Sequence, residues 1–275
     1  MEWLDRLTVV MDSISAGSME GLGITELVNR TQLSKGTLHR MLMSMIDHNL
    51  ISQNTETKKY RLGPKSMVWG SRFLAGQDTF ALLTEYCDVL AERTGLYTHL
   101  CRFDAGEVYC IYTRQPSEGR TAYFVHVGQR MPLHCTAAAK AILAFQPPSA
   151  VNSLFEKEQV ERYTEHTKID LEELKAELDQ VSKTRVAFCI EEIEPGVSAI
   201  STPVFQRKGE ALFSIGLIEA TQNLDSRREF LIEELLKMGE KASERMAAAY
   251  LLTSTGVGDP GRTPVESTKR MLNQV

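Results

Sequence analysis

The chain lacks the features that mark membrane and exported proteins. No apolar run in its 275 residues approaches the roughly 18 to 20 residues that a helix needs to cross a bilayer. The first residues, MEWLDRLTVVMDS, carry acidic side chains early and have no basic stretch followed by an apolar block. We therefore expect no signal peptide, and a cytoplasmic protein that makes no contact with a membrane.

Cysteine is scarce and irregularly spaced. The five cysteines, an odd number, include no close Cys-x-x-Cys pair; they are Cys87, Cys101, Cys110, Cys135 and Cys189. This pattern argues against a disulfide framework and against a zinc ribbon, and it favours reduced thiols. We expect no bound metal and no cofactor.

The chain also lacks the overall positive charge that is common in nucleic-acid-binding proteins, since its net charge is −5. The charge is unevenly distributed, however. Between residues 24 and 63 the basic residues Arg30, Lys35, Arg40, Lys58, Lys59 and Arg61 outnumber the acidic residues Glu26, Asp47 and Glu56. Acidic residues collect later, in DLEELKAELD and IEEIEPG. A basic segment in an acidic chain indicates that this segment contacts phosphate groups.

The first 63 residues have the pattern of three short helices and a hairpin. Thr25 and Ser34 are each placed to cap a helix, and apolar residues recur at helical spacing. We expect helices at 3–14, from 25 onward and at 35–49, and strands at 50–53 and 58–62. These are the parts of a winged helix-turn-helix. A small helical bundle whose third helix has a solvated polar face is the alternative.

The rest of the chain indicates an α+β domain in which helices flank an antiparallel sheet. Helices are expected at 80–94, 137–145, 150–159, 170–185 and 226–252, and strands at 97–103, 107–113, 122–127, 187–191, 197–204 and 211–218. The domain limits that we predict are a winged helix-turn-helix at 1–63, a linker helix at 64–79, a second domain at 80–252 and a flexible C-terminal tail at 253–275.

Three sequence blocks resemble the IclR family of bacterial transcription regulators. They are LSKGTLHRMLMSMIDHNLI followed by KYRLGP, then MPLHCTAAAKAILAF, and then EEIEPGVSAISTPVF. The resemblance extends from the start of the chain to about Thr253. It implies a GAF-like or profilin-like effector-binding domain at 80–252, a homodimer built through the DNA-binding domains, and often a tetramer.

The chain departs from the family pattern at several positions. Ala139 stands where the family usually has glycine before the lysine, and Cys189 stands where an acidic residue is frequent. In some members with a short-chain acid effector, two serines of the last strand help to hold the ligand. The matching positions here are Gly216 and Ile218.

A winged helix reads DNA with the N-terminal part of its third helix in the major groove, while the wing contacts phosphate. The residues expected to bind DNA are therefore polar side chains of this helix and of the hairpin: Ser34, Lys35, Thr37, His39, Arg40, Lys58, Lys59 and Arg61. The alternative for each is a solvated surface side chain.

The second block places small residues at the start of a helix, where backbone N–H groups and the helix dipole favour an anion. With residues of neighbouring strands, the predicted effector site comprises Phe124, His134, Cys135, Thr136, Ala137, Ala138, Cys189, Ala199 and Gly216. We expect a short-chain carboxylate or a semialdehyde there. A tightly packed helix whose alanines only fit the sheet is the alternative.

Other chemistry is conceivable at these residues. A thiol of Cys135 or Cys189 would trap an aldehyde if its pKa were lowered, but most buried cysteines are inert. Glu191 and Glu192, as neighbours on a strand, would face opposite ways, which favours a turn-stabilising or surface role over acid–base catalysis. A zinc site at His126, His134, Cys135 and Cys189 would lack the spacing of a known motif.

The sequence thus predicts a transcription repressor that binds a double-stranded DNA operator and responds to a small-molecule effector. It is not predicted to be an enzyme. Two rivals stay open: a small-molecule enzyme with an accessory winged helix, and a module whose winged helix binds a partner protein.

Overall fold

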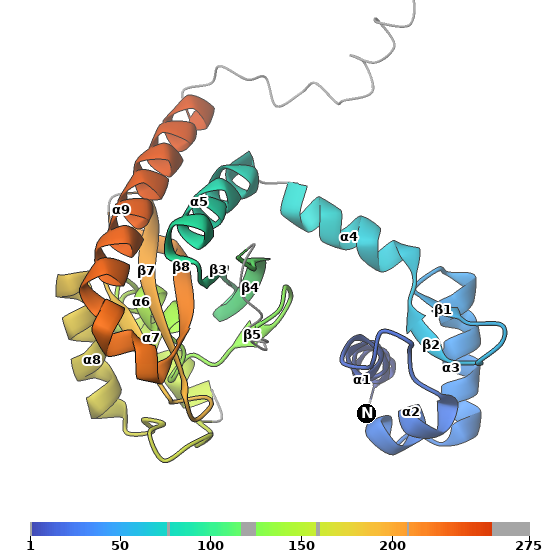
Figure 1. Ribbon diagram of the computed structural model, residues 1–275. Coiled ribbons are helices and arrows are strands. Elements are labelled where there is room, and N and C mark those ends of the chain that lie inside the picture. The colour runs from blue at the N-terminus through green and yellow to red at the C-terminus, as the bar shows by residue number, and fades with distance from the viewer. Residues whose placement is uncertain (1, 76–77, 117–124, 158–159, 208, 255–275) are drawn as a thin grey trace, which may run out of the picture. The chain divides into compact units, whose positions relative to one another are not determined.

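The computed structural model describes residues 2–75, 78–116, 125–157, 160–207 and 209–254. Contacts within the chain divide it into two compact units, Met1–Asp78 and Thr79–Val275, which are described separately below (Figure 1). In the described residues no helix is both long and apolar enough to cross a membrane.

The first unit is a winged helix-turn-helix. Its elements are α1 (Trp3–Ser15), α2 (Ile24–Thr31), α3 (Lys35–Asp47), β1 (Ile51–Gln53), β2 (Tyr60–Leu62) and α4 (Pro64–Ala75). Leu27, Leu38 and Leu42, from α2 and α3, are fully buried at its centre. They occupy the apolar stripes of helices whose other faces are polar, so burial of these stripes fixes which side of α3 faces solvent.

The hairpin is anchored to the loop after α1. Leu22 and Tyr60 form an antiparallel bridge beside the paired strands β1 and β2. Gly21 precedes this bridge with a φ of +90°, and a Cβ there would lie 2.5 Å from the carbonyl oxygen of Tyr60. Only glycine fits this conformation and this close approach without strain.

The second unit contains a six-stranded sheet in the order β5-β4-β3-β8-β7-β6, in which all neighbours are antiparallel. The strands are β3 (Tyr97–Asp104), β4 (Glu107–Arg114), β5 (Arg130–Met131), β6 (Ala187–Ile190), β7 (Val197–Arg207) and β8 (Glu210–Ala220). β3, β8 and β7 form its centre. Alternate residues of these strands therefore point to opposite faces of the sheet.

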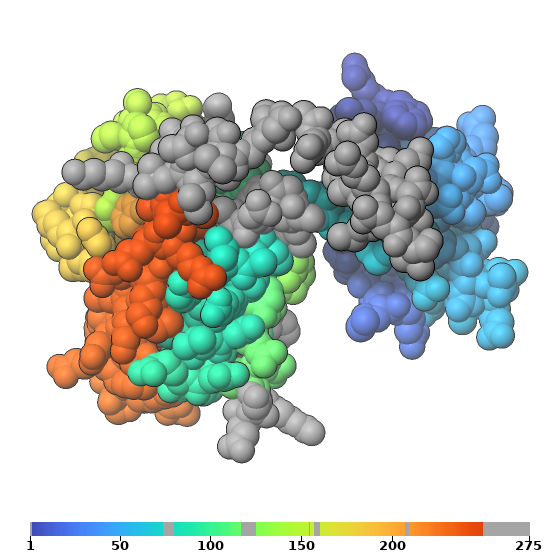
Figure 2. Space-filling model, turned by 90° about the horizontal axis from the view of Figure 1, so that it is seen from above, coloured from blue at the N-terminus to red at the C-terminus, as the bar shows by residue number. Residues whose placement is uncertain are grey.

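Helices cover both faces of this sheet. They are α5 (Asp78–Thr94), α6 (Ala137–Leu143), α7 (Pro148–Lys157), α8 (Leu171–Thr184) and α9 (Thr221–Ser254). α5 and α9 lie side by side on one face (Figures 1 and 2), and Arg93 of α5 pairs with Glu234 of α9. α6 packs on the other face, where Ala137 and Ala141 contact Ala187 and Cys189.

The predicted α+β class, with an N-terminal winged helix-turn-helix and an antiparallel sheet flanked by helices, is confirmed. Two details differ. The strand predicted at 122–127 falls partly outside the described residues, and residues 125–127 are not in a strand, whereas the short strand β5 was not predicted. The strand predicted to reach residue 191 ends at Ile190, because Glu191 adopts a left-handed φ of 54°.

Candidate functional site

The N-terminal turn of α3 presents a polar face to solvent. Ser34 caps the helix, and its Oγ accepts a hydrogen bond from the backbone N–H of Thr37 at 3.3 Å. Lys35, His39 and Arg40 are exposed, and Thr37 is half-buried. The apolar stripe that includes Leu38 turns this face outward, so the four side chains are available to a partner.

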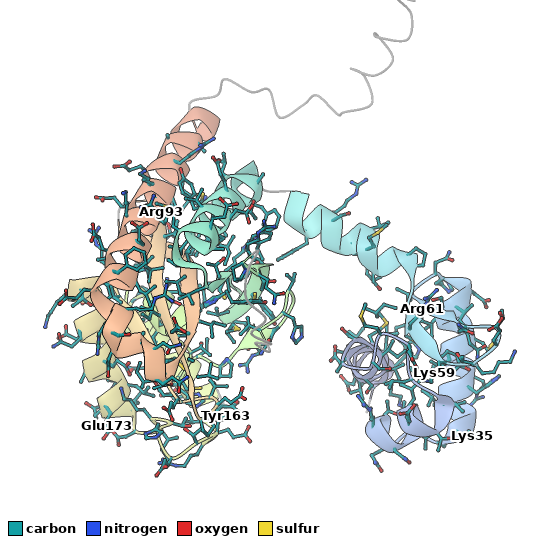
Figure 3. The ribbon with its side chains drawn as sticks, in the orientation of Figure 1. Lys35, Lys59, Arg61, Arg93, Tyr163 and Glu173 are labelled. Atoms are coloured by element: carbon teal, nitrogen blue, oxygen red, sulfur yellow. The ribbon has the colours of Figure 1, made fainter. Side chains whose placement is uncertain are left out.

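The three basic residues of the wing differ in exposure and in their hydrogen-bond partners. Lys58 is exposed and has a left-handed φ of 58° at the hairpin turn. Arg61 is exposed, and its Nε donates to Ser52 Oγ at 3.2 Å. Lys59 pairs with Glu20 at 2.9 Å; their hydrogen bond raises the pKa of Lys59 and lowers that of Glu20. Figure 3 shows Lys35, Lys59 and Arg61 on this unit.

The second unit has a cavity of about 340 Å³ between its sheet and the start of α6. Five of the predicted effector residues line it: Thr136, Ala137, Ala138, Cys189 and Ala199. Other predicted residues, His134, Cys135 and Gly216, do not line it, and Phe124 is outside the described residues. The remaining walls come from elsewhere and include Gln129, Arg130, Met131, Tyr163, Ile193, Glu194 and Ile218.

Thr136 shapes the start of α6. Its Oγ1 donates to the carbonyl of Pro132 at 2.7 Å and accepts from Ala139 N at 3.4 Å. Ala137 both lines the cavity and packs against the sheet, so the packing of the alanines and a pocket beside them coexist. His134 lies behind the wall: its Nε2 donates to the carbonyl of Glu161 at 2.9 Å, and its ring stacks on Tyr163, which lines the cavity.

His99, which the sequence analysis did not single out, lines the same cavity. It is 2% exposed, and its Nε2 lies 3.3 Å from Ser201 Oγ. Burial lowers the pKa of His99 to about 4, so the ring is neutral near pH 7. A single histidine within a strand pattern carries no sequence signal that separates it from a core residue.

The burial of His99 predicts acid sensitivity. The unfolded ring takes up a proton below its ordinary pKa of about 6.5, whereas the folded ring stays neutral down to about pH 4. The free energy of unfolding is therefore expected to fall by about 3 kcal/mol as the pH falls from 6.5 to 4. We expect urea unfolding of His99→Asn to change less over this range than that of the unsubstituted protein. Parallel pH profiles would contradict this.

Cys189 is not primed for covalent chemistry. Burial raises its pKa to about 11, so the thiol is protonated near pH 7. All five cysteines are free and buried. Within the described ranges, no group of three or more histidine, cysteine, aspartate and glutamate side chains is arranged to hold a metal ion.

A buried ion cluster lies next to the cavity and corrects the expectation for Glu192. Its side chain is neither at the surface nor in a turn role, because it is buried and lies 2.6 Å from Lys140 Nζ. Lys140 Nζ also donates to Glu177 Oε1 at 3.0 Å and to the carbonyl of Phe188 at 2.9 Å. Burial lowers the pKa of Lys140, but the two carboxylates outweigh this and raise it overall. The cluster ties α6 to the loop that contributes Ile193 and Glu194 to the cavity.

Two family models match the chain. The model of the IclR helix-turn-helix domain matches residues 4–55, and that of the bacterial transcriptional regulator IclR C-terminal domain matches residues 72–244.

Known proteins match most of the chain. The HTH-type transcriptional regulator XynR of Escherichia coli K12 is 30% identical over 88% of this chain and 95% of its own length. The DNA-binding transcriptional repressor YiaJ of the same organism is 27% identical over 74% of this chain and 73% of its own. A crystal structure of an IclR homolog from Microbacterium hydrocarbonoxydans, complexed with 4-hydroxybenzoate, superposes with a TM-score of 0.74 at 20% identity. It covers 90% of this chain and 100% of that chain.

Proposed function

The chain belongs to the IclR family of bacterial transcriptional regulators, and on that premise we propose that it is a cytoplasmic repressor whose operator binding is controlled by a small organic acid. The observation that carries this proposal is the exposed polar start of α3 beside a basic wing. A repressor role is supported by relatives that are named repressors, among them YiaJ.

The proposed DNA contacts are assigned to exposed side chains of α3 and of the wing. Lys35, His39 and Arg40 lie at the part of α3 that enters a major groove in a winged helix, where arginine can bond a guanine edge. Lys58 and Arg61 on the wing are placed for phosphate. Lys59 contributes less direct contact in this proposal, because Glu20 already partners its ammonium group.

The effector site is the cavity of the second unit. Its volume of about 340 Å³ would hold about ten water-sized groups at roughly 30 Å³ each, so the ligand is small. Most of its walls are apolar, while Gln129 and Arg130, whose Nε also pairs with Glu107, offer donors for a carboxylate. The relative that holds 4-hydroxybenzoate is consistent with an acid of this size. A semialdehyde that reacts with Cys189 is disfavoured by the protonated thiol.

The active species is proposed to be a homodimer or a tetramer of such dimers. The first unit exposes apolar side chains of α1 and α4, notably Trp3, Leu4, Met67, Trp69 and Phe73. A second copy of the chain would cover them and place two α3 helices on a palindromic operator. Ligand would release DNA only by binding one arrangement of the dimer more tightly than the other.

Substitution of Arg40 tests the DNA proposal. We expect Arg40→Ala to weaken binding to the operator beside the protein's own gene by about 10- to 100-fold, because a base contact is lost. Lys58→Ala is expected to weaken all DNA sequences similarly and to reduce the salt dependence of binding. Fluorescence anisotropy over a salt series measures both effects.

The matched control is Lys175→Ala, which removes a half-buried lysine of α8 in the second unit. Equal loss in Arg40→Ala and Lys175→Ala would refute the proposed contacts. Binding of a protein partner that survives Arg40→Ala and ignores DNA would favour the interaction module instead. Turnover of a ligand that Cys189→Ala abolishes would favour the enzyme.

A further inference from the structure

We propose that His99 recognises a hydroxyl group of the effector, so that the cavity selects hydroxy acids over the corresponding acids without the hydroxyl. This inference rests on the proposed function of the cavity as the effector site, and it names the chemical class of the ligand.

Three central strands build the position of His99. In the register of the sheet His99 of β3 pairs with Gly216 of β8, and Gly216 pairs with Ser201 of β7. A Cβ on Gly216 would lie 2.4 Å from His99 Nε2 and 2.3 Å from Ser201 Oγ. The missing side chain therefore leaves the space in which the imidazole reaches across β8 to the serine. Gly216 does not line the cavity, but its missing side chain allows the imidazole of His99 to do so.

The imidazole has an unmet hydrogen bond. Its Nε2 lies beside Ser201 Oγ, but its Nδ1 is buried and has no hydrogen-bond partner among the residues that the structure describes. A buried polar atom left without a partner costs about 1–3 kcal/mol. Since His99 lines the cavity, a ligand there is positioned to supply the missing partner.

A hydroxyl fits this atom in either tautomer of the ring. The serine hydroxyl can donate to Nε2 or accept from it, so Nδ1 carries its proton in one tautomer and a lone pair in the other. A carboxylate or carbonyl oxygen only accepts, whereas a hydroxyl both donates and accepts and so satisfies either tautomer. The carboxylate of the ligand is left for Gln129 and for Arg130, whose Nε also pairs with Glu107; both residues line the cavity from the chain segment around β5.

Direct binding tests the inference without DNA. Isothermal titration calorimetry of the full chain would compare matched pairs: 4-hydroxybenzoate with benzoate, lactate with propionate, and 3-hydroxybutyrate with butyrate. We expect one or more of the hydroxy acids to bind at least 10-fold more tightly than its partner acid. We expect His99→Phe to reduce this ratio to below 3-fold, because the phenyl ring fills the space and offers no hydrogen bond.

Two hydroxyl side chains of β7 supply a matched pair of variants. Ser201→Ala removes the partner of Nε2 and is expected to reduce the ratio. Thr202 does not line the cavity, and its Oγ1 donates to the carbonyl of Arg185 at 2.9 Å, so Thr202→Val should leave the ratio unchanged. If His99→Phe fails to fold, His99→Asn serves, with an expected reduction of the ratio of at least threefold.

The inference is overturned if no hydroxy acid of the panel binds, if paired acids bind equally, or if the preference survives both His99 substitutions. These results are separable from failure of the proposed function. A preference that depends on His99, with no effect of the ligand on operator binding, would refute the regulatory proposal alone. Release of the operator by an acid without a hydroxyl, bound as tightly as its hydroxy partner, would refute the inference alone.

Discussion

Replacing Lys140 with methionine is expected to destabilise the second unit by about 3–5 kcal/mol, since removal of one partner from a buried ion cluster leaves the other charges uncompensated. The ammonium group is 1% exposed and has three hydrogen-bond partners, two of them carboxylates. The carboxylate of Glu192 is left without compensation in this variant, because it is buried and its Oε2 has no hydrogen-bond partner in the described chain. Methionine has a similar length but offers neither charge nor donor.

The two units can be followed separately in this experiment. Both tryptophans, Trp3 and Trp69, belong to the first unit, so tryptophan fluorescence reports on that unit alone. Far-UV circular dichroism in urea also follows the helices and strands of the second unit. We expect Lys140→Met to lower the urea concentration at the midpoint of the second unit's transition, which only circular dichroism detects. The transition seen by fluorescence, which reports on the first unit, should not move.

Two further variants separate charge from packing. Lys168→Met removes the half-buried partner of Glu177, which lies 2.9 Å away, and should cost less than about 1 kcal/mol. Adding Glu192→Gln to Lys140→Met removes the stranded charge and should restore part of the loss. Equal costs for Lys140→Met and Lys168→Met, or no recovery in the double variant, would show that the buried charges are not what stabilises this region.

Local features of the fold were predictable from the sequence because they depend on neighbouring residues. Ser34 caps α3 through a bond to Thr37, three residues away, and the apolar stripe of α3 fixes its exposed face. The small residues after Thr136 likewise predicted a pocket beside α6, and two of them, Ala137 and Ala138, line one.

The rest depends on pairings between distant segments. Lys140 meets Glu192 across 52 residues of sequence, and Ser201 meets His99 across 102. The burial of Glu192 was not predicted, because the strand was expected to continue through this residue. Instead the backbone at Glu191 is left-handed, and the side chain of Glu192 points inward to Lys140. Gly216 does not line the cavity, and its lack of a side chain admits the ring of His99. Such roles follow from strand register, which no local pattern specifies.

Replacing both Trp69 and Phe73 with aspartate is expected to convert the protein to monomers and to weaken operator binding by about 100- to 10,000-fold. These residues lie four apart on α4 and are 55% and 52% exposed, and Met67 of the same helix is 72% exposed. Apolar side chains gathered on one helix are characteristic of a surface that another protein chain covers. Two aspartates in such an interface would be buried without partners, which opposes association.

The large expected loss of operator affinity arises because a dimer joins two α3 helices in one molecule. In a dimer, binding of one α3 helix to its half-site holds the second close to the other half-site, so the second contact occurs at a high effective concentration. A monomer loses this gain although its own α3 is unchanged. The substituted residues belong to α4, outside the buried core of the winged helix, so tryptophan fluorescence of Trp3 and circular dichroism should report a folded first unit.

Sedimentation velocity and fluorescence anisotropy with the operator measure the two consequences on the same samples. Val127→Asp is the matched control, because it places one aspartate at a 52% exposed apolar residue of the second unit. It should change neither the dimer nor the operator affinity. A Trp69→Asp/Phe73→Asp protein that remains dimeric and binds the operator normally would place the interface elsewhere. A monomer with unchanged operator affinity would instead mean that one α3 helix suffices, and that the palindromic arrangement is not how this regulator holds DNA.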